Sequence, residues 1–238
     1  MNDTVKESKS LNFKSTLKKI GSTILKGLKI FKEEFISYPL YIMSHPIKGF
    51  DDFKREKKGK LWVSFVFIAF IIFLNIISYQ LTGFIVNPTN DITKINTFKE
   101  IISVLGIIII ITVANWSITT LFDGKGKMKE IFMMISYSLF PLCWAKLICI
   151  FASNFITQNE VALYSLINGL GIFLMCYMAF FGFISIHEYG LLKCIVTLVA
   201  TAIAILVICF IGILAFDLFQ KMAGFIYTLY QEISLRYL

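Results

Sequence analysis

The chain has 238 residues and a net charge of +8, and 57% of its residues are hydrophobic while only 16% are charged. Soluble domains carry roughly 25% charged residues, so this composition excludes an ordinary soluble domain. Uncharged apolar runs of about 18 residues or more match the hydrocarbon thickness of a bilayer. The sequence therefore predicts an all-α, polytopic transmembrane helical bundle with about five spans, plus amphipathic N- and C-terminal helices.

Basic residues are concentrated near the N-terminus, where 14 of the 23 Lys and Arg precede Leu61. Such a cluster is attracted to an anionic membrane surface. No aromatic-interleaved basic groove or nucleic-acid motif accompanies it, so nucleic acid is not expected as a partner. The five cysteines lie in apolar stretches and the two histidines are far apart in the sequence. We therefore expect no disulfide framework, no metal site and no cofactor.

Residues 1–60 are predicted to form a cytoplasmic basic amphipathic segment and a juxtamembrane connector. Over 11–35, apolar residues recur at three- and four-residue steps and lysines occupy the other face. This pattern predicts a helix in the headgroup plane, and the alternative is a helix packed on the protein's own cytoplasmic face or on a partner. Pro39 is expected to end that helix, and Pro46 to block regular helix at His45. The connector ends in basic residues expected to face the anionic membrane surface, namely Lys54, Arg55, Lys57, Lys58 and Lys60.

Five apolar segments follow that are long enough to cross a bilayer with some tilt. The spans are predicted at residues 61–86, 101–122, 131–156, 162–186 and 194–219. Together they define a membrane domain over 61–219. The tail, 220–238, continues an apolar stripe with a period near 3.6, and we expect it to lie along the outer interface or on a neighbouring protein. A sixth span is the alternative, and it would return the C-terminus to the inside.

The distribution of Lys and Arg predicts the orientation. With the N-terminus in the cytoplasm, the inside segments hold 14, 3 and 1 basic residues, in 1–60, 123–130 and 187–193. The outside segments hold 2, 0 and 2, in 87–100, 157–161 and 220–238. Under the positive-inside rule, this bias predicts a multi-pass protein of the cell membrane with a cytoplasmic N-terminus. An odd number of spans places the C-terminus outside.

Polar residues inside the predicted spans are the candidate functional residues. Lys146 carries a charge well inside a span, which costs at least ~2.5 kcal/mol near the bilayer centre. Lys146 is either a counter-charge in a substrate path or a structural residue, which snorkels outward or pairs with another side chain. No acidic residue is predicted deep in another span to neutralise it. Pro141 is expected to kink the same helix. Asn115 and Tyr137 lie at similar distances from the loop 123–130, so an interhelical hydrogen bond between them is expected as fold glue.

Small residues in the sequence indicate turns and close packing. The segment GKGKMKE lacks the spacing of a phosphate-binding loop, and Gly124 is instead expected to cap the second span in a left-handed turn. Ser165 with Gly169, and Ala200 with Ala204, form small-x-x-x-small faces where helices can approach closely. No catalytic constellation of acid, base or nucleophile is present in the sequence, so we expect no enzymatic activity.

The hairpin from Ala114 to Leu142 resembles the Yip (Ypt-interacting protein) domain family, which shows a span, a short glycine-containing cytoplasmic turn and then an aromatic-rich Tyr…Pro segment. The matching residues are Gly124, Gly126, Lys129, Glu130, Tyr137 and Pro141. The connector before the first span and the five-span plan are similar to bacterial members, and the resemblance covers roughly residues 38–238. The Lys-rich, Arg-poor composition also favours a bacterial member.

This resemblance implies a limited range of functions. Eukaryotic relatives bind prenylated Rab-type GTPases and act in vesicle traffic and membrane shaping, whereas bacterial relatives lack such partners and some look like accessory proteins of ATP-binding-cassette transport systems. The preferred hypothesis is therefore a non-enzymatic scaffold or accessory subunit, which associates with itself or with other membrane proteins in transport or membrane organisation. The alternative is a small transporter or channel subunit with a polar path around Lys146, Asn115, Tyr137 and Pro141.

Overall fold

The computed structural model of the chain describes residues 29–88 and 96–237. All regular secondary structure within these ranges is helical, which confirms the predicted all-α class. Most of the amphipathic helix predicted over 11–35 lies outside the described residues.

The connector before the first span is more helical than the sequence predicts. A π-helical turn, η1 (Glu33–Ser37), runs directly into α2 (Tyr38–Ser44), and α3 (Pro46–Arg55) follows. Pro39 lies in the first turn of α2 and does not end the helix. The prediction at Pro39 is wrong because the helix widens directly before the proline, where the Tyr38 backbone N–H donates to the Glu33 carbonyl in a π-helical turn, and then continues to Ser44. His45 has φ −132° and ψ 68°, outside the helical region, and this confirms the predicted interruption before Pro46.

Five helical segments are long and apolar enough to cross a membrane within the described part of the chain. They are α4 (Leu61–Leu81), α5 (Thr97–Leu121), α6 (Met128–Ser138) with α7 (Phe140–Ala152), α8 (Val161–His187) and α9 (Leu191–Tyr237). A short 3₁₀ turn, η3 (Gln158–Glu160), precedes α8. The predicted number of spans is confirmed.

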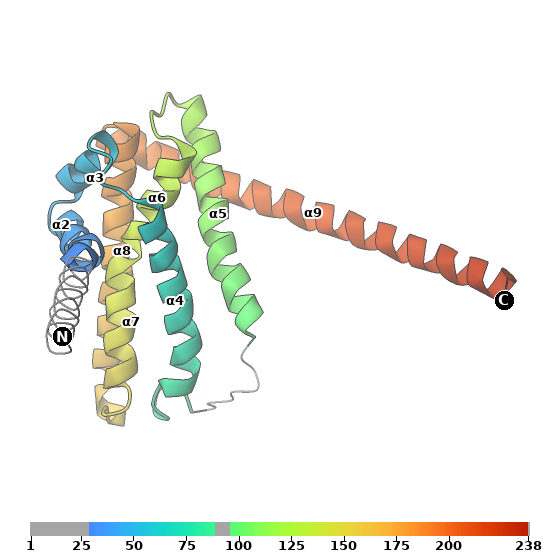
Figure 1. Cartoon of the computed structure of the whole chain (residues 1–238), viewed down its shortest axis with the longest axis horizontal. Helices are drawn as coiled ribbons and strands as arrows, with labels where there is room; N and C mark the ends of the chain where they lie inside the picture. The colour runs from blue at the N-terminus through green and yellow to red at the C-terminus, as the bar shows by residue number, and fades with distance from the viewer. Residues whose placement is uncertain (1–28, 89–95, 238) are drawn as a thin grey trace, which may run out of the picture.

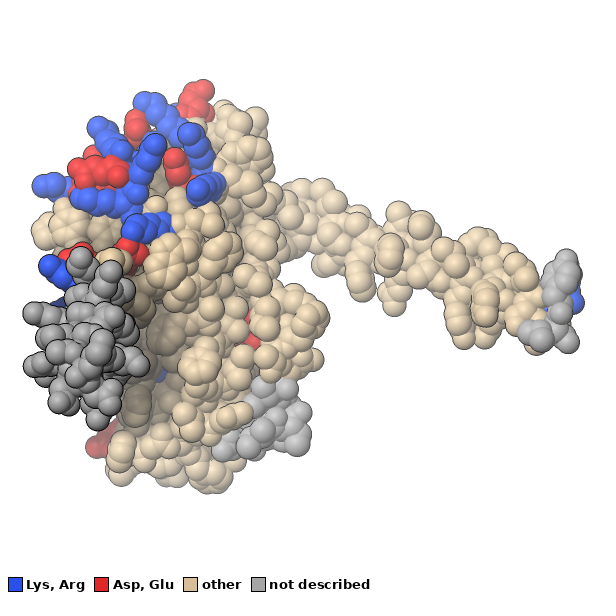
Figure 2. Space-filling view, in the orientation of Figure 1, with Lys and Arg blue, Asp and Glu red and all other residues tan. Residues whose placement is uncertain are grey.

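Four of these segments form a bundle. Figure 1 shows α4, α5, α7 and α8 running roughly side by side, with α2 and α3 beside one end of α8. We call this end of the bundle the basic end. It comprises α3, the loop 122–127 and residues 188–190. Lys and Arg gather over it with Asp and Glu between them (Figure 2).

Tyr137 on α6 lies at the centre of the core, with only 1% of its surface exposed. The rings of Phe53 and Phe67 contact it edge-on, with centroids 5.0 and 5.5 Å away, an arrangement that aromatic pairs favour. Phe53 belongs to α3 and is 2% exposed, and Phe50 on the same helix is fully buried. The apolar face of α3 therefore packs against the bundle, and the connector is part of the protein core.

The third span is broken at Leu139, between α6 and α7. Pro141 occupies the first turn of α7, where a missing backbone N–H interrupts no hydrogen bond within that helix. The kink predicted at this proline is confirmed.

The close approach of α7 and α8 involves Gly171. A Cβ atom placed on Gly171 would lie 2.3 Å from the Cβ of Ala145, whereas one placed on Gly169 would meet nothing within 4 Å. Ser165 and Gly169 are both exposed, so the packing face predicted from them is wrong. Residues two positions apart in an α-helix are rotated by about 200° around its axis. Gly169 and Gly171 therefore lie on opposite faces of α8.

The last helix is much longer than a membrane span. At 47 residues, α9 is about 70 Å long, and the fifth predicted span and the predicted tail are one continuous helix. An ion pair between Asp217 and Lys221, 2.8 Å apart, supports the helix where the span was expected to end. Its first turns pack on α5 through buried Cys194, Thr197 and Thr201, and it then leaves the bundle (Figure 1).

Candidate functional site

Lys146 lies between α4 and α7 and is hydrogen-bonded within the membrane domain. Its ammonium group donates to Oδ1 of Asn75 on α4. The Asn75 amide nitrogen lies 3.5 Å from Oε2 of Glu100, and the hydroxyl of Tyr79 donates to Oε1 of Glu100 at 3.2 Å. Lys146 is therefore paired through an amide to a carboxylate and does not stand alone in the apolar region.

Neither Asn75 nor Glu100 was singled out from the sequence. Glu100 was assigned to the outer loop because the second span was predicted to begin at 101, whereas α5 begins at Thr97 with Asn96 as its cap. The Asn96 side chain accepts a hydrogen bond from the Lys99 backbone N–H at 3.1 Å. That pattern, an asparagine before the apolar run with Glu100 in the first turn, is the signal that places the helix start earlier.

Asn115 connects three helices. It donates to the hydroxyl of Thr201 on α9 at 3.2 Å, and its Oδ1 lies 3.0 Å from Nε2 of His187 on α8. The hydrogen bond expected between Asn115 and Tyr137 is not formed, since the Tyr137 hydroxyl instead accepts from the Lys60 backbone N–H at 3.2 Å. Asn115 and His187 are each 1% exposed, so this is a buried polar junction that fixes the start of α9 to the bundle.

The loop 122–127 packs tightly on His187. A Cβ on Gly124 would lie 2.8 Å from Nδ1 of His187, and a Cβ on Gly126 would lie 2.7 Å from Cε1 of the same ring. The left-handed residue of this turn is Asp123, with φ 54°, and no described glycine has positive φ. The left-handed conformation predicted for Gly124 is therefore wrong, although its backbone N–H caps α5 by donating to the Thr119 carbonyl at 2.7 Å. Both glycines are needed for close approach to the imidazole.

An ion-pair bridge lies beside this junction at the basic end. Glu188 accepts from Lys54 on α3 at 3.1 Å and from Lys125 in the loop 122–127 at 2.7 Å. Lys54 also donates to the Ile186 backbone carbonyl at 2.8 Å. Hydrogen bonds from Lys125 and Lys54 lower the pKa of the Glu188 carboxyl to about 2. The bridge thus joins α3, the loop and the end of α8.

Most of the basic residues expected at the membrane surface have acidic neighbours. Arg55 pairs with Asp51 at 2.7 Å, Lys58 with Glu56 at 2.5 Å, and Lys60 with Glu34. Lys57 is exposed and adopts a left-handed conformation with φ 53°. The charge that this cluster presents to lipid is therefore smaller than its lysine count indicates.

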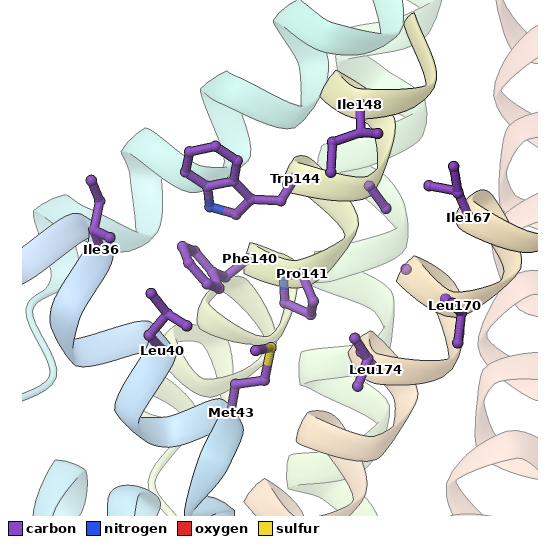
Figure 3. A pocket seen from close by; sticks show the side chains of 12 residues that line it. Ile36, Leu40, Met43, Phe140, Pro141, Trp144, Ile148, Ile167, Leu170 and Leu174 are labelled. Atoms are coloured by element: carbon purple, nitrogen blue, oxygen red, sulfur yellow. The ribbon is translucent and has the colours of Figure 1, made fainter. Parts of the chain in front are cut away.

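An apolar groove of about 490 Å³ lies between α2, α7 and α8. Figure 3 shows Trp144, Phe140 and Leu174 among its lining side chains, with Leu40 and Met43 contributed by α2. Pro141 lines the same groove, so the break between α6 and α7 helps to shape it. None of its lining residues has an acidic, basic or nucleophilic side chain.

The polar groups described above pair mainly with one another. Within the described residues, no group of three or more His, Cys, Asp or Glu could hold a metal ion. The junction around Asn115 and the pairing of Lys146 join helices, and neither Asn115 nor Tyr137 lines the polar cavity that Lys146 lines. Their arrangement is suited to holding helices together.

Comparison with protein families gives a match to the Yip1 domain over residues 40–214. A search of curated proteins found no match. A search of solved structures likewise found none.

Proposed function

Because the chain belongs to the Yip1 domain family, we propose that it acts as a non-enzymatic scaffold or accessory subunit of a membrane complex. The proposal places it in the cell membrane, with transport or membrane organisation as the process it serves. Anionic lipid at the cytoplasmic face and other membrane proteins, or further copies of the chain, are its proposed partners.

The observation that carries this proposal is the surface of α9. Every residue from Cys209 to Ile233 is exposed, and the segment contains large apolar side chains on all sides, including Phe210, Phe216 and Phe225. The part from Cys209 to Phe216 is apolar all round, and such a helix is stable only in hydrocarbon or against other apolar surfaces. After its anchor on α5, α9 thus offers a long surface for contacts outside its own bundle.

The alternative, a small transporter or channel subunit, has less support. It requires a polar path around Lys146, Asn115, Tyr137 and Pro141. Asn115 and Tyr137 are almost completely buried and hydrogen-bonded elsewhere, and Pro141 lines the apolar groove. Of these four residues, Lys146 lines a cavity with polar groups, and the other three do not line that cavity.

The proposed orientation places the N-terminus and the basic end in the cytoplasm and the C-terminus outside. Lys57→Cys at the basic end and Asn159→Cys between α7 and α8 test it, because both positions are exposed. A membrane-impermeant thiol reagent should modify Asn159→Cys in intact cells and Lys57→Cys only after the membrane is broken. The reverse pattern would show that the orientation is wrong.

The scaffold role is tested by the mass of the particle extracted from native membranes under mild conditions. The wild type should appear in a stoichiometric assembly, and trimming α9 with Phe216→Ala and Phe219→Ala should shift the chain towards monomer. The matched control trims α8 with Leu163→Ala and Leu170→Ala, which are also exposed. A wild-type monomer without a stoichiometric partner would contradict the proposal.

A further inference from the structure

A second cavity lies beside Lys146, and the scaffold proposal does not use it. It has a volume of about 270 Å³ and lies between α4, α7 and α8. Its polar lining comes from Lys146, Tyr164, Asn168, Ser78 and Cys149. Leu142, Ile150 and Ile172 supply the apolar part of the lining.

The polar groups of this cavity are mainly unused donors. A lysine ammonium has three N–H groups, and that of Lys146 makes a single hydrogen bond, to Asn75. Among the described residues, no carboxylate forms an ion pair with Lys146, since Glu100 is reached only through the Asn75 amide. Within the same part of the chain, neither the Tyr164 hydroxyl nor the Asn168 side chain has a hydrogen-bond partner. These donors are therefore available to a ligand in the cavity.

The chemistry of these groups selects an anion. One cation, one hydroxyl and one amide nitrogen converge from two helices, and a phosphate group offers only acceptor oxygens to them. A cationic ligand would be repelled by Lys146. The apolar lining supplied by Leu142, Ile150 and Ile172 suits a hydrocarbon chain attached to the anion.

The depth of the cavity favours a lipid over a free ion. Lys146 lies six residues before the end of α7 at Ala152, or about 9 Å along the helix, and Tyr164 and Asn168 lie about 5 and 10 Å beyond the start of α8. All three are at the end of the bundle opposite the basic end. Headgroup layers occupy roughly 5–8 Å on each side of the hydrocarbon, so the donors lie near the level of lipid phosphates.

We propose that the cavity between α4, α7 and α8 binds the phosphate group of a phospholipid from the leaflet opposite the basic end. Lys146 supplies the positive charge, and Tyr164 and Asn168 donate hydrogen bonds to the phosphate oxygens. Inorganic phosphate shares this chemistry, and the test separates the two sources.

The test measures binding of phosphatidylglycerol to the full-length purified chain by native mass spectrometry. Diacylglycerol with the same acyl chains is the ligand control. Tyr164→Phe and Asn168→Leu each remove a donor that has no hydrogen-bond partner within residues 29–88 and 96–237, so both variants should fold as the wild type does. Each should weaken phosphatidylglycerol binding by about tenfold, since one hydrogen bond to a charged group is lost. Lys146→Met should weaken it by more than tenfold, and Lys221→Met on α9, a lysine outside the cavity, should leave it unchanged.

Three results would overturn the proposal. The first is wild-type binding of phosphatidylglycerol by folded Tyr164→Phe and Asn168→Leu, whatever Lys146→Met does. The second is equal affinity of the wild type for phosphatidylglycerol and diacylglycerol. The third is displacement of the lipid by excess inorganic phosphate, which would identify the free anion as the ligand.

Discussion

Gly171→Ala tests the packing of α7 on α8. The new Cβ would lie 2.3 Å from the Cβ of Ala145, more than an ångström inside ordinary contact distance, so the two helices must separate. Overpacking in a well-packed region costs typically about 1–3 kcal/mol, and the size of the overlap favours the upper end. Replacing a helical glycine with alanine returns roughly 1 kcal/mol. The net destabilisation should be about 2 kcal/mol.

The assay is thermal unfolding of the purified chain in detergent, where about 2 kcal/mol corresponds to a decrease of roughly 4–8 °C in Tm. Gly169→Ala is the matched control, because it lies on the same helix with nothing within 4 Å of its new Cβ. It should leave Tm unchanged or raise it slightly. Adding Ala145→Gly to Gly171→Ala should recover part of the loss, since it removes the opposing methyl group. Equal Tm values for Gly171→Ala and Gly169→Ala would refute the assigned α7–α8 contact.

Two further predictions concern the basic end. Asn115→Leu should lower the free energy of unfolding by about 1–3 kcal/mol, because it leaves the buried His187 ring without its partner. Thr120→Val on the exposed face of α5 is the control. An equal effect of the two variants on Tm would contradict the junction. Glu188→Gln should be less stable than the wild type at pH 7, and the difference should shrink as pH falls from about 4.5 to about 2. The reason is that the Glu188 carboxyl has a lowered pKa in the folded chain, so its stabilising effect is present above its ordinary pKa and is lost on protonation. A difference in Tm that does not change with pH would rule out the ion-pair bridge.

The helices that cross the membrane could be predicted from the sequence because their apolar runs exceed what any soluble core needs. The interruption before Pro46 and the kink at Pro141 were also predictable, since a missing backbone N–H acts locally. Pro39 was not, because the π-helical turn that accommodates it has no signal of its own in the sequence.

The pairing inside the bundle could not be predicted with the same success. Asn75 carries no formal charge, so charge complementarity alone does not identify it as the partner of Lys146, although the sequence shows a polar amide inside an apolar span. His187 and Gly126 lie 61 residues apart in the sequence, and only the packing of the loop 122–127 on α8 brings them together. Depth along neighbouring helices did suggest a partner for Asn115, but rotation around each helix axis determined that the partner was His187.

The anchor of α9 at Thr201 has a mechanical consequence. From Thr201 to Tyr237 the helix is unbroken, so this part is a stiff lever about 54 Å long. A tilt of about 10° at the Asn115–Thr201 hydrogen bond displaces the far end by about 9 Å, given that length. Any change of angle at this anchor is therefore multiplied along the helix into a much larger displacement of its C-terminal end.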